Sequence, residues 1–62
     1  MDILNKMYEF LVNYGIATKE EINLITTING NNIKTYEDIL YIRTGYQAFY
    51  QLSEWEGGDY NE

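Results

Sequence analysis

The chain has 62 residues and a net charge of -6, because ten acidic side chains outnumber four basic ones. This length suits one small domain, which buries roughly 60% of the surface that its unfolded chain exposes and has little apolar material left for a deep substrate pocket. The sequence contains no histidine, cysteine or proline. It therefore lacks the usual zinc ligands, imidazole groups, thiols and disulfides, and we expect neither enzyme activity nor a cofactor.

The start of the chain and its apolar content predict a cytoplasmic protein. Residues 1–6 lead directly into an amphipathic segment, without the basic start and apolar run of a secretory signal. No apolar stretch approaches the roughly 18 residues of a membrane span, so we expect no membrane association. The absence of cysteine agrees with a reducing compartment.

Residues 3–14 are predicted to form the first helix. Their apolar side chains recur at the spacing of one helix face. Asp2 is a suitable cap for the helix start, and Gly15 suits the left-handed backbone position just after a helix end.

Residues 19–28 are predicted to form the second helix. Thr18 and Glu21 have the spacing of a capping box, in which each side chain accepts a hydrogen bond from the other residue's amide. Asn29-Gly30 ends the apolar pattern. The same pair is also a hairpin signal, and the alternative is a hairpin that pairs residues 22–28 with residues 33–39. The capping box and the three-residue apolar spacing favour the helix.

Residues 36–43 are predicted to form the third helix, after a second capping box in which Thr35 is the cap. A joint at Thr44-Gly45 then begins a fourth helix that ends near residue 54, because Gln47 can complete a box with Thr44. The alternative is one continuous helix over residues 36–54, with Gly45 costing about 1 kcal/mol relative to alanine.

These elements predict an all-α fold, a small three-helix bundle whose third helix is split or continuous. The helical domain covers residues 1–55. Residues 56–62 are predicted to be a flexible acidic tail, because they combine acids with Gly57-Gly58 and carry no base. The apolar faces predict a core of Leu4, Met7, Leu11, Ile22, Ile25, Ile28, Ile39, Ile42 and Phe49.

Two pairs of adjacent carboxylates, Glu20-Glu21 and Glu37-Asp38, raise the question of catalysis or metal binding. Each pair is predicted to lie in the first turn of a helix, where negative charge complements the helix dipole. Neighbouring side chains on a helix also diverge, so neither pair can hold one ion alone. We therefore predict no catalytic residue and no metal site.

The aromatic side chains do not by themselves indicate nucleic-acid binding. A stacking surface for single strands also needs a positive groove, and the four bases are scattered along the chain. Half of the ten rings are instead expected to belong to the core, namely Phe10, Tyr14, Tyr46, Phe49 and Tyr50.

An alternative function is nucleic-acid binding through a degenerate helix–turn–helix around residues 38–46. A recognition helix would then present polar side chains to the bases, and only Gln47 and Gln51 qualify. The acidic residues that follow would repel the phosphates, so we expect no binding to duplex DNA.

Two sets of short segments resemble known kinds of protein. Residues 11–16, 29–33 and 38–40 resemble the compact three-helix ubiquitin-associated pattern, which implies a three-helix topology, although Glu37 stands where that pattern has an apolar residue. The segments Tyr14–Thr18, Ile28–Gly30 and Arg43–Tyr46, before an acidic tail, resemble short uncharacterised proteins of Firmicute phages and integrated elements. That resemblance implies a small bacterial cytoplasmic factor that acts on another protein.

The leading hypothesis for function is a non-enzymatic, acidic protein-interaction module. Tyr41 and Trp55 are the candidate interface residues, because helical spacing leaves Tyr41 opposite Ile39 and places Trp55 where the last helix should fray. The alternative for Trp55 is that it closes the bottom of the bundle against Met7 or Phe10. A third hypothesis for the protein is a homodimer whose exposed aromatic rings meet across a two-fold axis.

Overall fold

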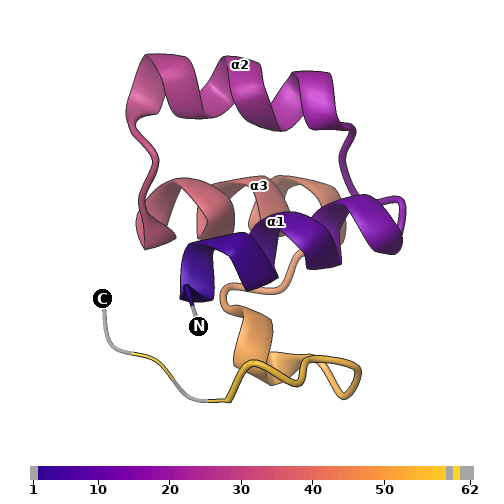
Figure 1. The fold of residues 1–62 in the computed structure, drawn as a ribbon. Coiled ribbons are helices and arrows are strands. Elements are labelled where there is room, and N and C mark those ends of the chain that lie inside the picture. Colours follow the sequence, from indigo (N-terminus) through magenta and orange to yellow (C-terminus); the bar gives the residue numbers. More distant parts are fainter. Residues whose placement is uncertain (1, 59, 61–62) are drawn as a thin grey trace.

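The computed structural model describes residues 2–58 and 60, which form three α-helices and one short 3-10 turn. The helices are α1 (Ile3–Asn13), α2 (Lys19–Asn29) and α3 (Ile33–Thr44), and the 3-10 turn η1 covers Phe49–Gln51. Figure 1 shows α2 on one side of α1 and α3, and η1 with the segment after it on the opposite side. The predicted all-α three-helix bundle is confirmed, and the hairpin alternative is wrong.

The first two helices begin where the sequence predicts, because side chains satisfy amides that a helix start leaves unpaired. The Asp2 carboxylate accepts from the Leu4 amide at 3.0 Å. Thr18 and Glu21 form the predicted capping box, with both hydrogen bonds at 3.1 Å. The far ends of α1 and α2 each differ from the predicted residue by one position, which is the usual uncertainty of helix ends.

The third helix begins three residues before the predicted start, so Thr35 is not its cap. Asn32 is the cap, since its side-chain oxygen accepts from the Thr35 amide at 3.0 Å and from the Thr35 hydroxyl at 3.2 Å. Glu37 therefore lies in the second turn and is buried. The explanation of Glu37 by the helix dipole is wrong, because its carboxylate is held in the interior.

The joint after α3 is confirmed, but the fourth helix is not. Gly45 has a left-handed backbone with φ of 85°, and its amide donates to the Tyr41 carbonyl. The Thr44 hydroxyl donates to the Leu40 carbonyl of α3 at 2.8 Å and accepts from the Tyr46 amide at 3.2 Å, so it closes the turn after α3. In the described chain after Gly45 only η1 is helical, so the fourth helix to residue 54 and the continuous helix over residues 36–54 are both wrong.

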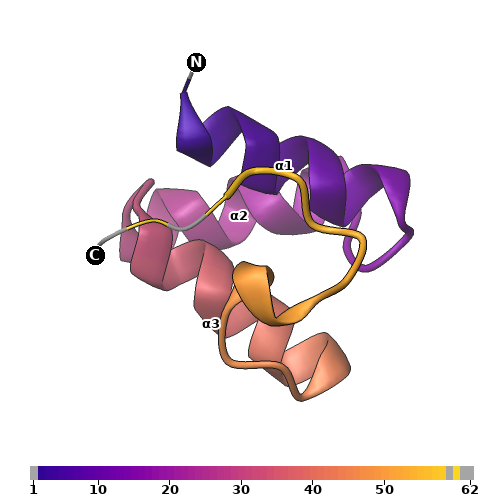
Figure 2. The same cartoon turned by 90° about the horizontal axis from the view of Figure 1, so that it is seen from below.

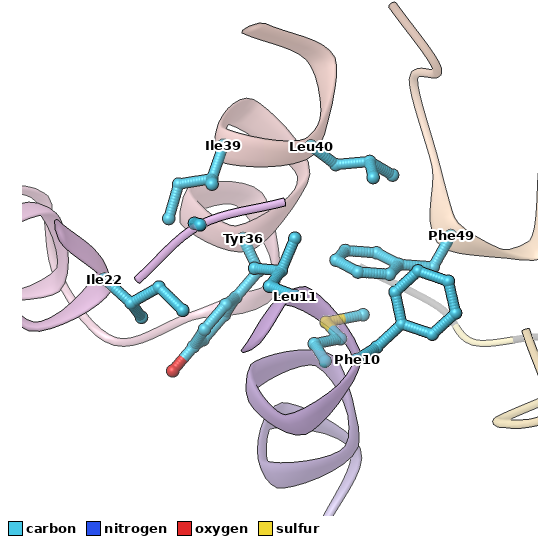
Figure 3. Packing of buried hydrophobic residues seen from close by; sticks show 9 residues of the cluster. Phe10, Leu11, Ile22, Tyr36, Ile39, Leu40 and Phe49 are labelled. Carbon is cyan, nitrogen blue, oxygen red and sulfur yellow. The ribbon is translucent and has the colours of Figure 1, made fainter. Parts of the chain in front are cut away.

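All four helical elements contribute side chains to one core (Figure 3). The largest fully buried side chains are Phe49, Met7, Leu11, Ile22 and Leu40. The Phe10 and Phe49 rings meet edge to face, with centroids 5.8 Å apart. Figure 3 shows these two rings on one side of Leu11 and Ile22 on the other side. Phe49 therefore extends the core from the helices into the segment that follows them.

The predicted core is correct in its centre and wrong at its edges. Met7, Leu11, Ile22, Ile39 and Phe49 are buried, and Leu4 and Ile25 are half-buried. Ile28 and Ile42 are 71% and 76% exposed. Tyr14, Tyr46 and Tyr50 are also exposed, so their assignment to the core is wrong.

The predicted core is wrong at Ile42 because another face of α3 packs against the core. Tyr36 and Leu40 are buried beside Ile39, and these three positions lie on one side of a helix. Ile42 lies away from that side. Helix α3 therefore packs through the face of Tyr36, Ile39 and Leu40, and the predicted pairing of Ile39 with Ile42 on the core face is wrong.

The first prediction concerns this core. Leu11→Ala removes a fully buried side chain from α1, so the free energy of unfolding should fall by about 2–5 kcal/mol. Leu24→Ala is the matched control, since Leu24 is 62% exposed on α2 and its loss should cost less than about 0.5 kcal/mol. Urea denaturation followed by far-ultraviolet circular dichroism measures both. Equal losses would show that α1 does not pack as described.

Candidate protein-binding groove

The segment after η1 returns along the bundle and contacts α1. We call Leu52–Gly58 together with Tyr60 the C-terminal strap, which is the gold trace that passes in front of α1 in Figure 2, where the molecule is seen from below. Residues 59, 61 and 62 lie outside the described part of the chain. The flexibility predicted for residues 56–62 stays a prediction, although the described strap residues Gly57 and Tyr60 are half-buried.

Trp55 attaches the strap to the aromatic end of the core. Its ring meets Phe10 edge to face at 5.5 Å between centroids, and it lies 5.0 Å from Phe49 in a tilted arrangement. The indole Nε1–H donates to the Gly58 carbonyl at 3.0 Å. This placement agrees with the alternative in which Trp55 packs against Phe10. The ring remains partly exposed, and its role at an interface stays a prediction.

Gly57 lies directly against the Trp55 ring. A Cβ atom added at Gly57 would come within 2.1 Å of the ring carbon Cζ2 and within 2.8 Å of Cη2. Real Cβ atoms do not approach other atoms so closely, so the strap can follow this course only with glycine at position 57.

Tyr60 holds the end of the strap. Its hydroxyl accepts a hydrogen bond from the Phe49 amide at 2.8 Å and also bonds to the buried Glu37 carboxylate. Its ring meets Tyr50 edge to face at 5.4 Å. Burial is the main reason that the pKa of Tyr60 lies above its ordinary value, and the hydrogen bond to Glu37 raises it further. The neutral hydroxyl is therefore the form that the fold retains.

A hollow of about 490 Å³ lies between α1 and the strap, and we call it the α1–strap groove. Helix α1 and its C-cap Tyr14 line one side of the groove, where α1 contributes Asn5, Lys6, Glu9, Phe10 and Asn13, and the strap contributes residues 54–57. Three of these side chains are carboxylates, Glu9, Glu54 and Glu56, and Lys6 is the single base. The strap side of the groove is therefore acidic, whereas Glu9 and Lys6 balance each other on the α1 side.

Aromatic rings form part of the groove surface. The Phe10 and Tyr14 rings stack with centroids 4.4 Å apart and an interplanar angle of 22°. Since Phe10 is buried and Tyr14 is 56% exposed, the pair runs from the core to the solvent. Trp55 adds a third ring from the strap. The groove thus combines aromatic surface with a polar, negatively charged surround.

The structure does not bring the two predicted interface residues together. Tyr41 is 54% exposed on α3, where it lines a second hollow of about 450 Å³ with Lys34, Glu37, Asp38 and Gln47. That hollow shares no lining residue with the α1–strap groove. The exposure predicted for Tyr41 is confirmed, whereas its role in an interface stays a prediction.

Sequence reasoning missed the contribution of α1 to this site. Asn5, Glu9 and Asn13 recur every four residues, and Phe10 and Tyr14 form a parallel pair beside them. The Asn5 amide donates to the Glu9 carboxylate at 2.9 Å, as expected for side chains four residues apart on a helix. This spacing was a signal for a polar stripe next to an aromatic one, but only the fold shows that the strap lies along both.

The described residues offer little for other kinds of site. Among residues 2–58 and 60, no group of three or more acidic, histidine or cysteine side chains is placed to hold a metal ion. In the same part of the chain, no helix is long and apolar enough to cross a membrane. Comparisons with known protein families, with curated proteins and with solved structures give no match to this chain. The two resemblances described above therefore stay predictions.

The second prediction tests the packing of the strap. Gly57→Ala should displace the strap from α1, because the new Cβ atom would overlap the Trp55 ring. Trp55 is the only tryptophan of the chain, so its emission should shift to longer wavelength and iodide should quench it more strongly. Ser53→Ala, at an exposed strap position, is the control and should leave the emission unchanged. Unchanged emission in the Gly57 variant would exclude the close packing of the strap.

The third prediction uses the raised pKa of Tyr60. A group whose pKa is raised by folding contributes stability below its ordinary value, which is 10.0 here, and that stability is lost as the pH rises toward the folded value. Tyr60→Phe keeps the ring but removes the hydroxyl. At about pH 8 the variant should be less stable than the wild type by about 0.5–1.5 kcal/mol.

The stability difference between the wild type and Tyr60→Phe should narrow as the pH rises to about 11, because only the wild type has a proton to lose at position 60. Urea midpoints for both proteins across this range measure it. Tyr8→Phe is a control, because it removes one tyrosine hydroxyl from α1 instead of from the strap. A constant difference between wild type and the Tyr60 variant would contradict the hydrogen-bonded role of the hydroxyl.

Proposed function

We propose that this chain is a non-enzymatic protein-interaction module and that the α1–strap groove is its binding surface. The observation that carries the proposal is the combination of Tyr14 and Trp55 with three carboxylates in one hollow. Aromatic anchors inside a polar surround are the usual anatomy of interface hot spots. In this proposal the chain acts in the cytoplasm of a Firmicute host, as a small protein of phage or integrated-element origin, in line with the resemblance described above.

Charge defines the occupant that we propose for the groove. The chain carries a net charge of -6, and the groove lining has three acids and one base. Complementary potentials speed the association of partners and disfavour partners of like charge. The partner is therefore a protein that presents a basic segment, and duplex DNA is not a ligand, because its phosphates would meet the same carboxylates.

The fold also bears on the nucleic-acid alternative. A helix–turn–helix would place a recognition helix after the joint at Gly45. The described chain instead has the short turn η1 there, followed by the acidic strap. This arrangement supports protein binding in preference to nucleic-acid binding.

The fourth prediction tests the groove as a protein interface. A photoreactive phenylalanine replaces Tyr14 in the groove or, in separate proteins, Tyr41 on α3 and Leu24 on α2. After illumination in a Firmicute lysate, the proposal predicts a discrete adduct at position 14 that excess unlabelled wild type removes. A competitor carrying Glu54→Gln and Glu56→Gln should remove it less effectively.

Adducts that form only at position 24 or 41 would move the interface to another face and overturn the proposal. An adduct whose mass equals two copies of this chain would instead support the homodimer hypothesis. Sedimentation over a range of concentrations would then show whether the free chain associates.

A further inference from the structure

The α1–strap groove offers a cation two kinds of surface. One face of the Tyr14 ring is stacked on Phe10, and more than half of the Tyr14 surface is open to solvent. The Trp55 ring lines the same groove from the strap. Aromatic faces attract cations through their quadrupole, most strongly when the ring is tryptophan or tyrosine. A positively charged group can therefore lie against rings that come from two different elements.

The carboxylates of the groove keep the capacity to accept further hydrogen bonds. Glu9 accepts one bond from Asn5, and Glu54 accepts one from Ser53. A carboxylate has about four acceptor sites, so each retains most of its capacity. Within residues 2–58 and 60, the ion pairs are Lys34–Asp38 and Arg43–Glu21, and neither includes a carboxylate of the groove.

We propose that the α1–strap groove binds an arginine side chain of the partner's basic segment. The guanidinium group would lie against Tyr14 or Trp55 and donate to the groove carboxylates. This inference rests on the proposed function, because it specifies the chemistry of the residue that enters the same groove.

Arginine fits this groove better than other cations do. Its guanidinium group is planar, stacks on aromatic faces and presents five donors in a fork that matches carboxylates. Lysine carries a compact and strongly hydrated charge that does not stack in this way. A quaternary ammonium group has no N–H to donate, so it would leave the acceptor capacity of Glu9, Glu54 and Glu56 unused.

The strap places two of these carboxylates, and Tyr60 fixes the strap. The bond from the Phe49 amide to the Tyr60 hydroxyl ties the end of the strap to η1, while Trp55 ties its middle to Phe10. Holding the groups in place before the ligand arrives lowers the entropy cost of binding. Tyr60 is thus a positioning residue that does not line the groove itself.

The test uses synthetic peptides in place of the unidentified partner. A fluorescein-labelled peptide with arginines separated by glycine and serine is titrated with the full chain at low ionic strength. Two matched peptides carry lysine or the neutral analogue citrulline at the same positions. The arginine peptide should bind more tightly than the lysine peptide by about threefold or more, and more tightly than the citrulline peptide by about tenfold or more.

Variants of matched charge locate the site. Glu54→Gln and Glu56→Gln should each weaken binding of the arginine peptide by roughly two- to fivefold. Glu20→Gln removes the same charge at an exposed position on α2 and should change binding less. Tyr60→Phe should weaken binding without removing any group of the groove, and Tyr8→Phe is its control.

Two results would overturn the inference. Equal binding of the arginine and lysine peptides would remove the preference for a guanidinium group. Equal weakening by the Glu20, Glu54 and Glu56 variants would reduce the interaction to the general charge of the chain. If neither peptide binds while the position-14 adduct still forms in the lysate, the arginine inference fails and the proposed function stands.

Discussion

The burial of Phe49 is the constraint on which the rest of the structure depends. Three helices of 11, 11 and 12 residues leave one end of their shared core open, and the Phe49 ring from η1 fills it. A small domain has few apolar residues to spare, so a ring contributed from outside the helices has a large effect on stability. Its contacts with Phe10 and Trp55 then bring the strap against α1. The groove between α1 and the strap therefore depends on Phe49 closing the open end of the core.

The same aromatic side chains pack against one another and line the candidate binding groove. Phe10 is buried, but it supports the exposed Tyr14 ring on one side and contacts Trp55 on the other. Exposed rings that rest on buried rings are held in fixed positions, which favours recognition because little freedom is lost on binding. The acidic residues beside them keep this surface hydrated and disfavour association between like-charged copies of the chain.

Local signals in the sequence predicted the first two helices and the joint at Gly45, because capping and left-handed glycine positions depend on a few adjacent residues. The start of α3 was predicted wrongly, since Asn32 and Thr35 both offer a cap and the burial of Tyr36 and Glu37 favours the earlier one. The strap could not be predicted. Trp55 follows directly on the predicted fourth helix in sequence, but its ring contacts Phe10, which lies near the other end of the chain. The sequence alone indicated Trp55 as a candidate interface residue. It did not indicate Glu9 and Tyr14, because only the fold places them beside the strap.

The groove joins α1, near the start of the chain, to the strap, near its end. A surface of this kind exists only when both segments are folded, because α1 supplies one side of the groove and residues 54–57 supply the other. Contacts between distant segments also form late in folding, since the loop between them must close first. A partner that recognises this groove would therefore distinguish chains in which the strap is packed on α1 from chains in which it is not.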